Sequence, residues 1–174
     1  EQLMAAAKAG KHVYCEKPWT LNADDGQEAL EAFAAANLKV AIGHNRRFAP
    51  NSLAMKDVIE AGKLGSPIHI DGHFSSNLAP AVGLWRDSRI ESPAGGMTSM
   101  GIHALDMFIH LFGSVHTVDV QSKRIASPID VDDSTLVRLN FSSGCTGHLT
   151  TISTTSMLWR ISAYCTGGWV ECRD

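Results

Sequence analysis

The stretch HVYCEKPWTL, residues 12–21, ends an apolar run in the charged pair Glu16 and Lys17 and then stops at Pro18. We interpret residues 12–15 as a buried strand, which places Lys17 just beyond the strand end. Ligands of parallel α/β sheets bind beyond the carboxyl ends of the strands. Pro18 fixes the adjacent backbone and permits a cis Lys17–Pro18 bond. Lys17 is thus placed to contact a ligand, unless it pairs with Glu16 or another acid on a solvated loop.

Polar side chains also follow the next predicted strand, residues 38–43. His44, Asn45, Arg46 and Arg47 come directly after it. Because the carboxyl ends of neighbouring parallel strands meet at one edge of the sheet, we expect Lys17 and the arginine pair to share a crevice edge.

A second group of candidate residues lies in AGGMTSMGIHALD, residues 94–106. Gly95 and Gly96 let the backbone approach another group closely. Ser99 and His103 are four residues apart and share one face near the start of a predicted helix. A histidine there suits general acid or base catalysis, because its ordinary pKa is ~6.5. The alternative is a histidine on the polar face of the helix.

The same helix carries a rival pattern for a metal site. His103, Asp106 and His110 are spaced to share one helical face, as zinc or iron ligands would be. The sequence lacks a distinct ligand motif such as H-E-x-x-H. We therefore expect no metal, and we keep a metal-dependent enzyme only as the weaker alternative.

The tetrapeptide LWRD, residues 84–87, places Trp85 next to Arg86. It lies in residues 75–96, which show no regular period, and a long patternless segment in a compact chain is typical of a functional loop. An aromatic ring beside a planar cation suits a stacked or anionic ligand. The alternative is an anchoring tryptophan next to a surface arginine.

Apolar periodicity predicts the elements that position these residues. We expect helices at residues 2–9, 22–37, 52–62 and 99–113. We expect strands at residues 12–15, 38–43, 68–74, 117–121, 137–141, 145–153, 159–165 and 169–172. The first fifty residues read as a βαβ unit of a parallel sheet, and the later strands, joined by tight turns, read as an antiparallel sheet.

The predicted buried faces follow from the same periods. Three inward sets are expected: Met55, Val58 and Ile59; Ile68, Ile70 and Phe74; and Leu105, Phe108, Ile109 and Phe112. The order of the predicted elements divides the chain near residue 48 into an α/β part, which contains the βαβ unit, and an α+β part, which contains the antiparallel strands.

The composition is that of an ordinary globular protein, with 174 residues, 44% hydrophobic, 19% charged and a net charge of −3. The charge gives no reason to expect binding to nucleic acid or to a membrane surface. The four cysteines lack C-x-x-C pairing and read as reduced thiols of a cytoplasmic protein. The chain starts without methionine inside a helical pattern and ends directly after a strand pattern, so we expect a piece of a longer protein.

Together these motifs resemble the Gfo/Idh/MocA oxidoreductases. The resemblance rests on five segments, in order: AGKHVYCEKPWTLNADD, GHNRRFAP, WR, GGMTSMGIHALDMFIHLFG and YCTGGWVE. It implies that residues 1–48 are the C-terminal part of a Rossmann domain binding NAD or NADP. It implies that residues 49–174 form an α+β domain with a largely antiparallel open sheet, which serves the substrate and oligomerisation. The G-x-G-x-x-G half of the Rossmann domain and the C-terminal end are expected to be missing.

The resemblance also implies roles for individual residues. Lys17, in E-K-P, corresponds to a lysine near the nicotinamide and substrate, and His103, in G-x-H-x-x-D, to the usual proton acceptor. The residues expected near the cofactor are Glu16, Lys17, Pro18, Arg47, Trp85 and Arg86. Those expected near the substrate are Ser99, His103 and Asn45.

The implied activity is hydride transfer between the cofactor and a hydroxyl-bearing carbon of a sugar, polyol or cyclic diol, by a homo-oligomer, a dimer or a tetramer. One departure matters, because many members carry aspartate where this chain has Ser99. A serine cannot hold negative charge or orient a group by ion pairing. The alternative is therefore a non-catalytic, dinucleotide-dependent sensor or scaffold of the same fold.

Overall fold

A computed structural model describes residues 1–78 and 82–174. The chain forms two compact units, Glu1–His44 and Asn45–Asp174. The predicted loop at 75–96 includes residues 79–81, which lie outside the described residues.

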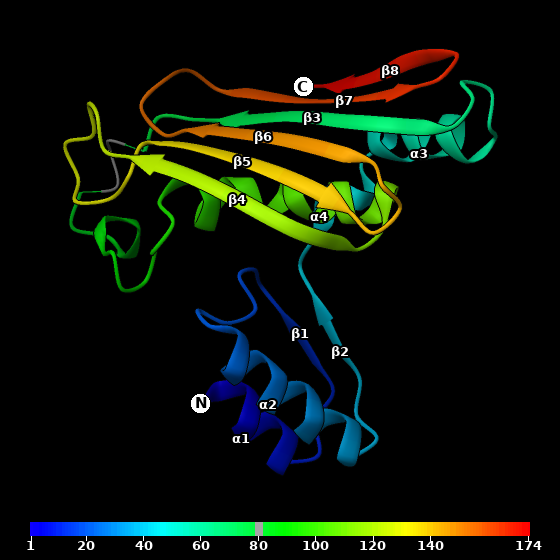
Figure 1. Cartoon of the computed structure of the whole chain (residues 1–174). Coiled ribbons are helices and arrows are strands. Elements are labelled where there is room, and N and C mark those ends of the chain that lie inside the picture. Colours follow the sequence, from blue (N-terminus) through cyan, green and yellow to red (C-terminus); the bar gives the residue numbers. More distant parts are fainter. Residues whose placement is uncertain (79–81) are drawn as a thin grey trace. The chain divides into compact units, whose positions relative to one another are not determined.

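The first unit is a βαβ unit preceded by a helix, as the sequence predicts (Figure 1). Its elements are α1 (Gln2–Lys8), β1 (Val13–Cys15), α2 (Ala23–Ala35) and β2 (Val40–Ile42). The strands β1 and β2 pair in parallel, and α1 and α2 lie side by side. Asn22 caps α2, because its side chain accepts a hydrogen bond of 2.8 Å from the backbone N–H of Asp25.

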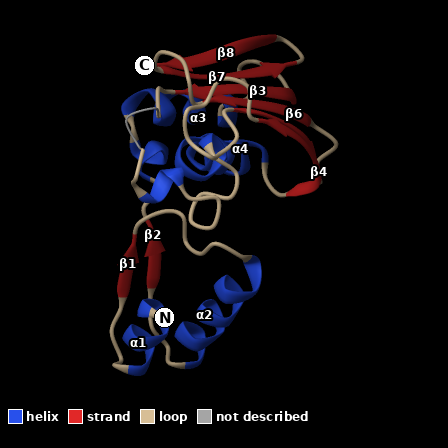
Figure 2. Cartoon of the chain, turned by 90° about the vertical axis from the view of Figure 1, so that its left-hand side faces the viewer, coloured by secondary structure: helices blue, strands red, loops and turns tan. Residues whose placement is uncertain are grey.

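The second unit is a six-stranded sheet with helices on one face (Figures 1 and 2). Its helices are η1 (Asn45–Phe48), α3 (Pro50–Glu60), η3 (Trp85–Asp87), η4 (Met97–Gly101) and α4 (Ile102–Phe112). Its strands are β3 (Pro67–Ser75), β4 (Val115–Lys123), β5 (Ser134–Phe141), β6 (Thr146–Ile152), β7 (Leu158–Cys165) and β8 (Gly168–Arg173). This mostly antiparallel sheet confirms the predicted α+β part.

The strand order is β4-β5-β6-β3-β7-β8. Strands that follow one another in sequence pair in an antiparallel manner: β4 with β5, β5 with β6, and β7 with β8. This is the pairing expected of strands joined by tight turns. The strand β3 lies between β6 and β7 and runs parallel to β6. This central placement brings the end of β3 close to the start of the α4 helical segment, where the candidate site lies.

The core lies between the sheet and the helices α3 and α4. Its fully buried side chains include Ile70, Met107, Phe108, Leu149 and Trp159. Alternate residues of β5 are buried, and the others face the side of the sheet that no helix of the described chain covers. Burial of the apolar stripe of α4 against this sheet fixes the helix that carries His103 and, with it, the preceding turn η4 that carries Ser99.

Two predicted core residues are not in the core. Ile68 is 50% exposed, because the register with β7 shifts between Pro67 and His69 at the start of β3. Ile109 is 42% exposed, because the stripe of α4 that faces the sheet runs through Ala104, Phe108 and Phe112 with Met107 beside it. Val58 is only half-buried, whereas Met55 and Ile59 are buried as predicted.

In the described part of the chain, no helix combines the length and apolar character that a membrane span needs. Cys15, Cys145, Cys165 and Cys172 are free thiols. Burial raises the pKa of the Cys165 and Cys172 thiols, which disfavours their reactive thiolate forms.

Candidate active site

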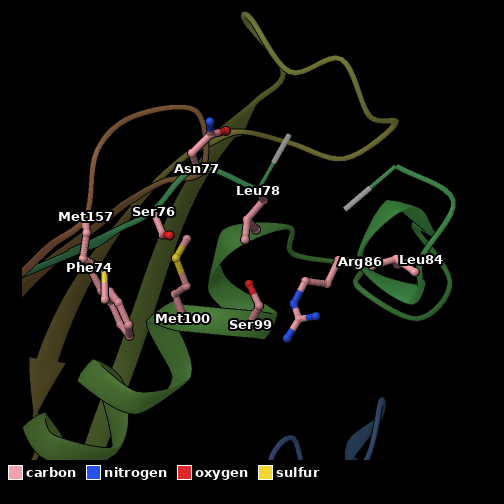
Figure 3. A pocket seen from close by; sticks show the side chains of 9 residues that line it. All are labelled: Phe74, Ser76, Asn77, Leu78, Leu84, Arg86, Ser99, Met100 and Met157. Atoms are coloured by element: carbon pink, nitrogen blue, oxygen red, sulfur yellow. The ribbon is translucent and has the colours of Figure 1, made fainter. Parts of the chain in front are cut away.

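A pocket of about 330 Å³ opens in the second unit at the end of β3 (Figure 3). Its lining comes from β3 and the segment after it, from the start of η3, from η4 and from the turn between β6 and β7. The lining residues are Phe74, Ser76, Asn77, Leu78, Leu84, Arg86, Ser99, Met100 and Met157. Two residues predicted from the sequence, Ser99 and Arg86, therefore share one pocket.

Ser99 lies in η4, a π-helical turn that runs directly into α4. Such turns are rare and occur often at functional sites. The neighbouring glycines allow this turn to press against β6. A Cβ at Gly96 would lie 3.2 Å from the Thr151 hydroxyl oxygen, and one at Gly101 would lie 2.8 Å from the Thr151 methyl carbon. This contact holds Ser99 at the pocket wall.

Gly95, like Gly96, lies in a close backbone contact of the kind predicted from the sequence. It has a positive φ of 51°, and a Cβ there would lie 2.2 Å from the carbonyl oxygen of Asp132. The backbone at Gly95 and Gly96 thus approaches other segments of the protein itself. The glycine pair positions the π-helical turn.

His103 lies in the first turn of α4, four residues after Ser99, and is half-buried. Its ring centroid lies 6.3 Å from that of Phe74, which lines the pocket. His103 therefore neighbours a lining residue, although it is not itself part of the described lining.

Trp85, Arg86 and Asp87 form the short helix η3, in which Trp85 is exposed and Arg86 is half-buried. The Arg86 guanidinium carbon lies 4.2 Å from the centroid of the Trp85 ring. Asp87 ties this helix to neighbouring segments, because its carboxylate accepts backbone hydrogen bonds from Gly83 (3.0 Å) and Asp130 (3.1 Å). These two bonds lower the pKa of Asp87. Arg86 lines the pocket, whereas Trp85 is outside the described lining.

Arg47 forms a bidentate ion pair with Asp106 of α4. Its Nε lies 2.6 Å from Oδ2 and its Nη2 lies 2.5 Å from Oδ1. The hydrogen bond to Asp106 raises the pKa of Arg47. Burial and the nearby Arg47 charge lower the pKa of His110, whose Nδ1 lies 3.3 Å from Arg47 Nη1.

This pairing bears on the metal alternative. Both carboxylate oxygens of Asp106 are bound to Arg47, and His110 faces the same guanidinium. Among the residues that the structure describes, no three His, Cys, Asp or Glu side chains are grouped so as to hold a metal ion. His103, Asp106 and His110 are thus not arranged as metal ligands, because Asp106 and His110 face Arg47, and the weaker metal alternative has no support from this geometry.

In the first unit, Lys17 follows the carboxyl end of β1, and the Lys17–Pro18 bond is cis. The backbone N–H of Gly43, just after β2, donates to the carbonyl oxygen of Cys15 at 2.8 Å, so the two strand ends meet. A Cβ at Gly43 would lie 3.2 Å from Glu16 Oε1, so the Glu16 side chain packs closely against this glycine.

The segment after Lys17 is anchored on α2. Trp19 Nε1 donates to the carbonyl oxygen of Gly26 at 3.3 Å, and a Cβ at Gly26 would lie 2.9 Å from Thr20 Oγ1. Gly26, which weakens α2 as a helix, is needed for this contact. Glu16 and Pro18 also line an open cavity of about 990 Å³ within this unit.

One predicted residue lies outside the described lining, and some lining residues were not predicted individually. Asn45 begins η1, is exposed and is not part of the described lining. Asn77, Leu78 and Leu84 fall in the predicted functional loop, although nothing singled them out individually. Met157 was missed, because it enters the pocket from a turn distant in sequence that carries no chemical signal.

Two family descriptions match the chain. The GFO/IDH/MocA C-terminal domain matches residues 52–171, and the oxidoreductase family with an NAD-binding Rossmann fold matches residues 1–44. The chain belongs to the Gfo/Idh/MocA oxidoreductase family. The resemblance seen in the sequence is thereby confirmed, as is the fold class.

Gfo/Idh/MocA relatives and solved structures agree with this assignment. An uncharacterised oxidoreductase of Schizosaccharomyces pombe is 33% identical over 144 residues, which cover 81% of this chain and 38% of that protein. Myo-inositol 2-dehydrogenase of Thermotoga maritima is 34% identical over 153 residues, which cover 84% of this chain and 44% of that protein. The crystal structure of an NAD binding oxidoreductase from Klebsiella pneumoniae superposes with a TM-score of 0.85 at 27% identity. The superposition covers 94% of this chain and 48% of that one. The chain thus spans less than half the length of these relatives.

Proposed function

We propose that the full-length protein is an NAD(P)-dependent oxidoreductase that transfers hydride between the nicotinamide and a hydroxyl-bearing carbon of its substrate. The observation that carries this proposal is the position of His103. His103 lies on helix α4, one helical turn after Ser99 of the pocket lining, and its ring centroid is 6.3 Å from that of Phe74, another lining residue. A titratable imidazole beside a ligand-sized pocket suits proton transfer to or from a substrate hydroxyl.

The two proposed catalytic residues have complementary tasks. When a C–OH group is oxidised, its proton must leave and negative charge builds on its oxygen. His103 takes the proton, and the ammonium of Lys17 stabilises the charge on the oxygen. In the reverse direction, His103 returns the proton. The cofactor, when bound, accepts or donates the hydride.

We assign the cofactor mainly to the strand-end segment of the first unit. Glu16, Lys17 and Pro18 follow β1, and the backbone N–H of Gly43 after β2 donates to the carbonyl oxygen of Cys15, so both strand ends lie at this edge. This arrangement fits the rule that ligands bind beyond the carboxyl ends of parallel strands. Trp85, on η3, stays a predicted cofactor contact.

The cofactor roles predicted for Arg47 and Arg86 stay predictions. The Arg47 guanidinium is bound to Asp106, and Arg86 lines the pocket together with Ser99. The choice between NAD and NADP rests on no residue described in this chain.

The proposed substrate is a sugar, polyol or cyclic diol. The pocket volume of about 330 Å³ suits a molecule of that size. Ser76, Asn77 and Ser99 supply neutral hydrogen-bonding groups to its lining. The similarity to a myo-inositol 2-dehydrogenase supports a polyhydroxylated substrate. We propose that Ser99 and His103 contact it directly, and Asn45 stays a predicted contact.

A second candidate is a non-catalytic, dinucleotide-dependent sensor or scaffold of the same fold. The residue that favours it is Ser99, which supplies no charge at the pocket wall one helical turn before His103. Under this second candidate, a site without a charged partner at that position binds a ligand but does not orient it for hydride transfer.

Cofactor reduction separates the two candidates. The full-length protein is mixed with NAD or NADP and a panel of sugars, polyols and cyclic diols, while absorbance reports the reduced nicotinamide and calorimetry reports cofactor binding. We expect turnover with at least one compound. Cofactor binding without reduction by any compound would favour the sensor and contradict the enzyme.

We also propose that the protein is a homo-oligomer, a dimer or a tetramer, formed through the helix-free face of the sheet. Tyr164 and Trp169 are paired neighbours on β7 and β8, and Trp169 is 62% exposed. Exposed aromatic side chains on an uncovered sheet face are typical of an interaction surface. Sedimentation of the full-length protein and of Trp169→Glu tests this. Identical monomer masses for both would contradict it.

Two broader assignments accompany these proposals. We propose that residues 1–48 serve the cofactor and residues 49–174 serve the substrate and assembly. We also propose a cytoplasmic location, which the four free thiols support.

A further inference from the structure

We propose that Phe74 is a positioning residue, which holds the imidazole of His103 in one orientation, and that Arg46 and Trp159 hold the Phe74 ring. This inference rests on the proposed oxidoreductase function, in which His103 transfers the proton. The observation behind it is the set of groups that surround Phe74 near the end of β3.

Phe74 lies where the core of the second unit meets the pocket. Its side chain is buried in the same core cluster as Trp159. It is also one of the residues that line the pocket (Figure 3). One side chain therefore belongs both to the packed interior and to the surface that a ligand would contact.

The Phe74 ring lies close to the imidazole of His103. The two ring centroids are 6.3 Å apart, and the ring planes are tilted by 47°. Interacting aromatic rings in proteins have centroids roughly 4.5–7 Å apart. His103 is half-buried in the first turn of α4. Phe74 thus fills the space on one side of the imidazole and excludes the His103 conformers that would enter that space.

Two further groups fix the Phe74 ring. Phe74 and Trp159 are opposite each other in the pairing of β3 with β7, and their rings meet edge to face with centroids 5.0 Å apart. The Arg46 guanidinium carbon lies 5.6 Å from the Phe74 centroid and 4.5 Å from the Trp159 centroid. The sheet register therefore sets the ring pair, and the cation packs on both rings.

Arg46 is itself anchored. Its Nη1 forms an ion pair with the carboxylate of Asp174. Asn51 donates from Nδ2 to the other oxygen of that carboxylate at 3.1 Å. A continuous series of contacts thus runs from Asp174 through Arg46 and Phe74 to His103.

Proton transfer depends on the orientation that this series of contacts holds. A general acid or base must stay within hydrogen-bond reach of the group whose proton it transfers, and a small misplacement lowers the rate. Without the ring of Phe74, the His103 imidazole gains conformers, and a smaller share of molecules is ready to react. The loss should appear mainly in kcat, whereas a residue that only contacts the substrate acts mainly through KM.

Replacement of the ring in the full-length protein tests the kinetic effect. Phe74→Leu should lower kcat roughly 10-fold and change KM by less than about threefold, and Phe74→Tyr, which keeps the ring, should restore most of the loss. Phe112→Leu is the matched control. Phe112 and Phe74 are both 7% exposed, and Phe112 packs on Phe141 but does not line the described pocket.

Phe112→Leu should keep kcat within about threefold of the wild-type value. Thermal unfolding of both variants shows whether they lose similar stability. Equal losses of kcat in Phe74→Leu and Phe112→Leu, or a loss confined to KM, would overturn the inference. If Phe74→Leu does not fold, Phe74→Met replaces it with the same expected kinetics.

Histidine NMR of the full-length protein tests the orientation without turnover. With histidine labelled with ¹³C at Cε1, the signal missing from His103→Asn identifies His103. The order parameter of this imidazole should fall in Phe74→Leu and stay unchanged in Phe112→Leu. An unchanged order parameter in Phe74→Leu would overturn the inference even if kcat fell. A lowered order parameter without turnover of any compound would support the contact and remove the oxidoreductase function.

Replacement of Arg46 tests the outer contact, because it leaves both rings in place. Arg46→Gln should lower kcat roughly two- to fivefold and lower the His103 order parameter less than Phe74→Leu does. Arg138→Gln is the matched control, because Arg138 pairs with Asp119 on the exposed sheet surface, and it should change neither quantity. Wild-type values of both quantities in Arg46→Gln would overturn the part of the inference that concerns Arg46.

Discussion

Arg47 holds Asp106 by two parallel hydrogen bonds, of 2.6 Å and 2.5 Å, which join the turn after the first unit to the middle of α4. The Asp106 side chain is only 10% exposed and that of Arg47 is 33% exposed. A pair in this environment is screened less by water than one on the surface. The contact fixes the rotation of the helix on which His103 lies one turn earlier.

We expect Asp106→Asn to reduce the free energy of unfolding by about 2 kcal/mol, because the partly buried Arg47 charge loses its partner. The control is Asp119→Asn, which breaks the exposed ion pair between Asp119 and Arg138 on the sheet surface. That loss should be below about 1 kcal/mol. Urea unfolding of both variants measures the difference, and equal losses would show that Asp106 has no special structural role.

Gly95→Ala should destabilise the protein by about 2 kcal/mol or more. Alanine there adopts an unfavourable positive φ, and its Cβ would lie 2.2 Å from the Asp132 carbonyl oxygen. Gly144→Ala is the matched control, because Gly144 also has a positive φ but no atom within 4 Å of the new Cβ. Its cost should be about 1 kcal/mol. Thermal unfolding of both variants is the measurement, and a smaller loss at Gly95 would exclude the close contact.

The revised buried face of α4 is tested by two neighbouring positions. Met107→Ala should lower the free energy of unfolding by about 2 kcal/mol or more, because Met107 is fully buried. Ile109→Ala should lower it by less than about 1 kcal/mol, because that side chain is 42% exposed. Chemical denaturation of the two variants decides between the faces, and the reverse order would restore the face predicted from sequence.

Local patterns in the sequence were sufficient for most elements. The Asn22 cap, the strand before Lys17 and the stop at Gly113 are set by neighbouring residues, and each was found where expected. The pairing of β3 with β6 and β7 was not predictable in this way, because it depends on contacts about 80 residues apart in sequence.

The site was predictable only in part, for a related reason. Ser99 and His103 stand out by residue type and spacing, and Arg86 stands out beside a tryptophan. Phe74 and Met157 resemble core or surface residues, and only the tertiary fold brings them to the pocket. Similarly, the glycines at 95 and 96 signalled a close approach, but the segment approached could be identified only in the structure.

Stability should fall in mild acid because of His73. Burial and the nearby Arg160 charge lower the pKa of His73 below its ordinary value of 6.5, although Asp71 opposes this. His148 lies in the same group and lowers the pKa further. Below pH 6.5, His73 binds a proton in the unfolded chain but not in the folded one. The free energy of unfolding therefore keeps its full value above pH 6.5 and falls as the pH drops from 6.5 to the lowered pKa of folded His73.

His73→Asn should therefore flatten the dependence of unfolding free energy on pH below 6.5. Urea titrations at a series of pH values give the slopes for the two proteins. The comparison at pH 8, where the imidazole is neutral in both states, isolates any packing loss. A variant whose slope below pH 6.5 matches that of the wild type would exclude His73 as the source.

The central claim is that Lys17 and His103 act together on one substrate oxygen. Its most direct test is the kcat of the full-length enzyme and of Lys17→Met, His103→Asn and the double variant, with thermal unfolding as the control for folding. Each single change should lower kcat by roughly 10²- to 10⁴-fold. The double variant should lose little more, because the two groups serve one step. Near wild-type kcat in either single variant would contradict the claim.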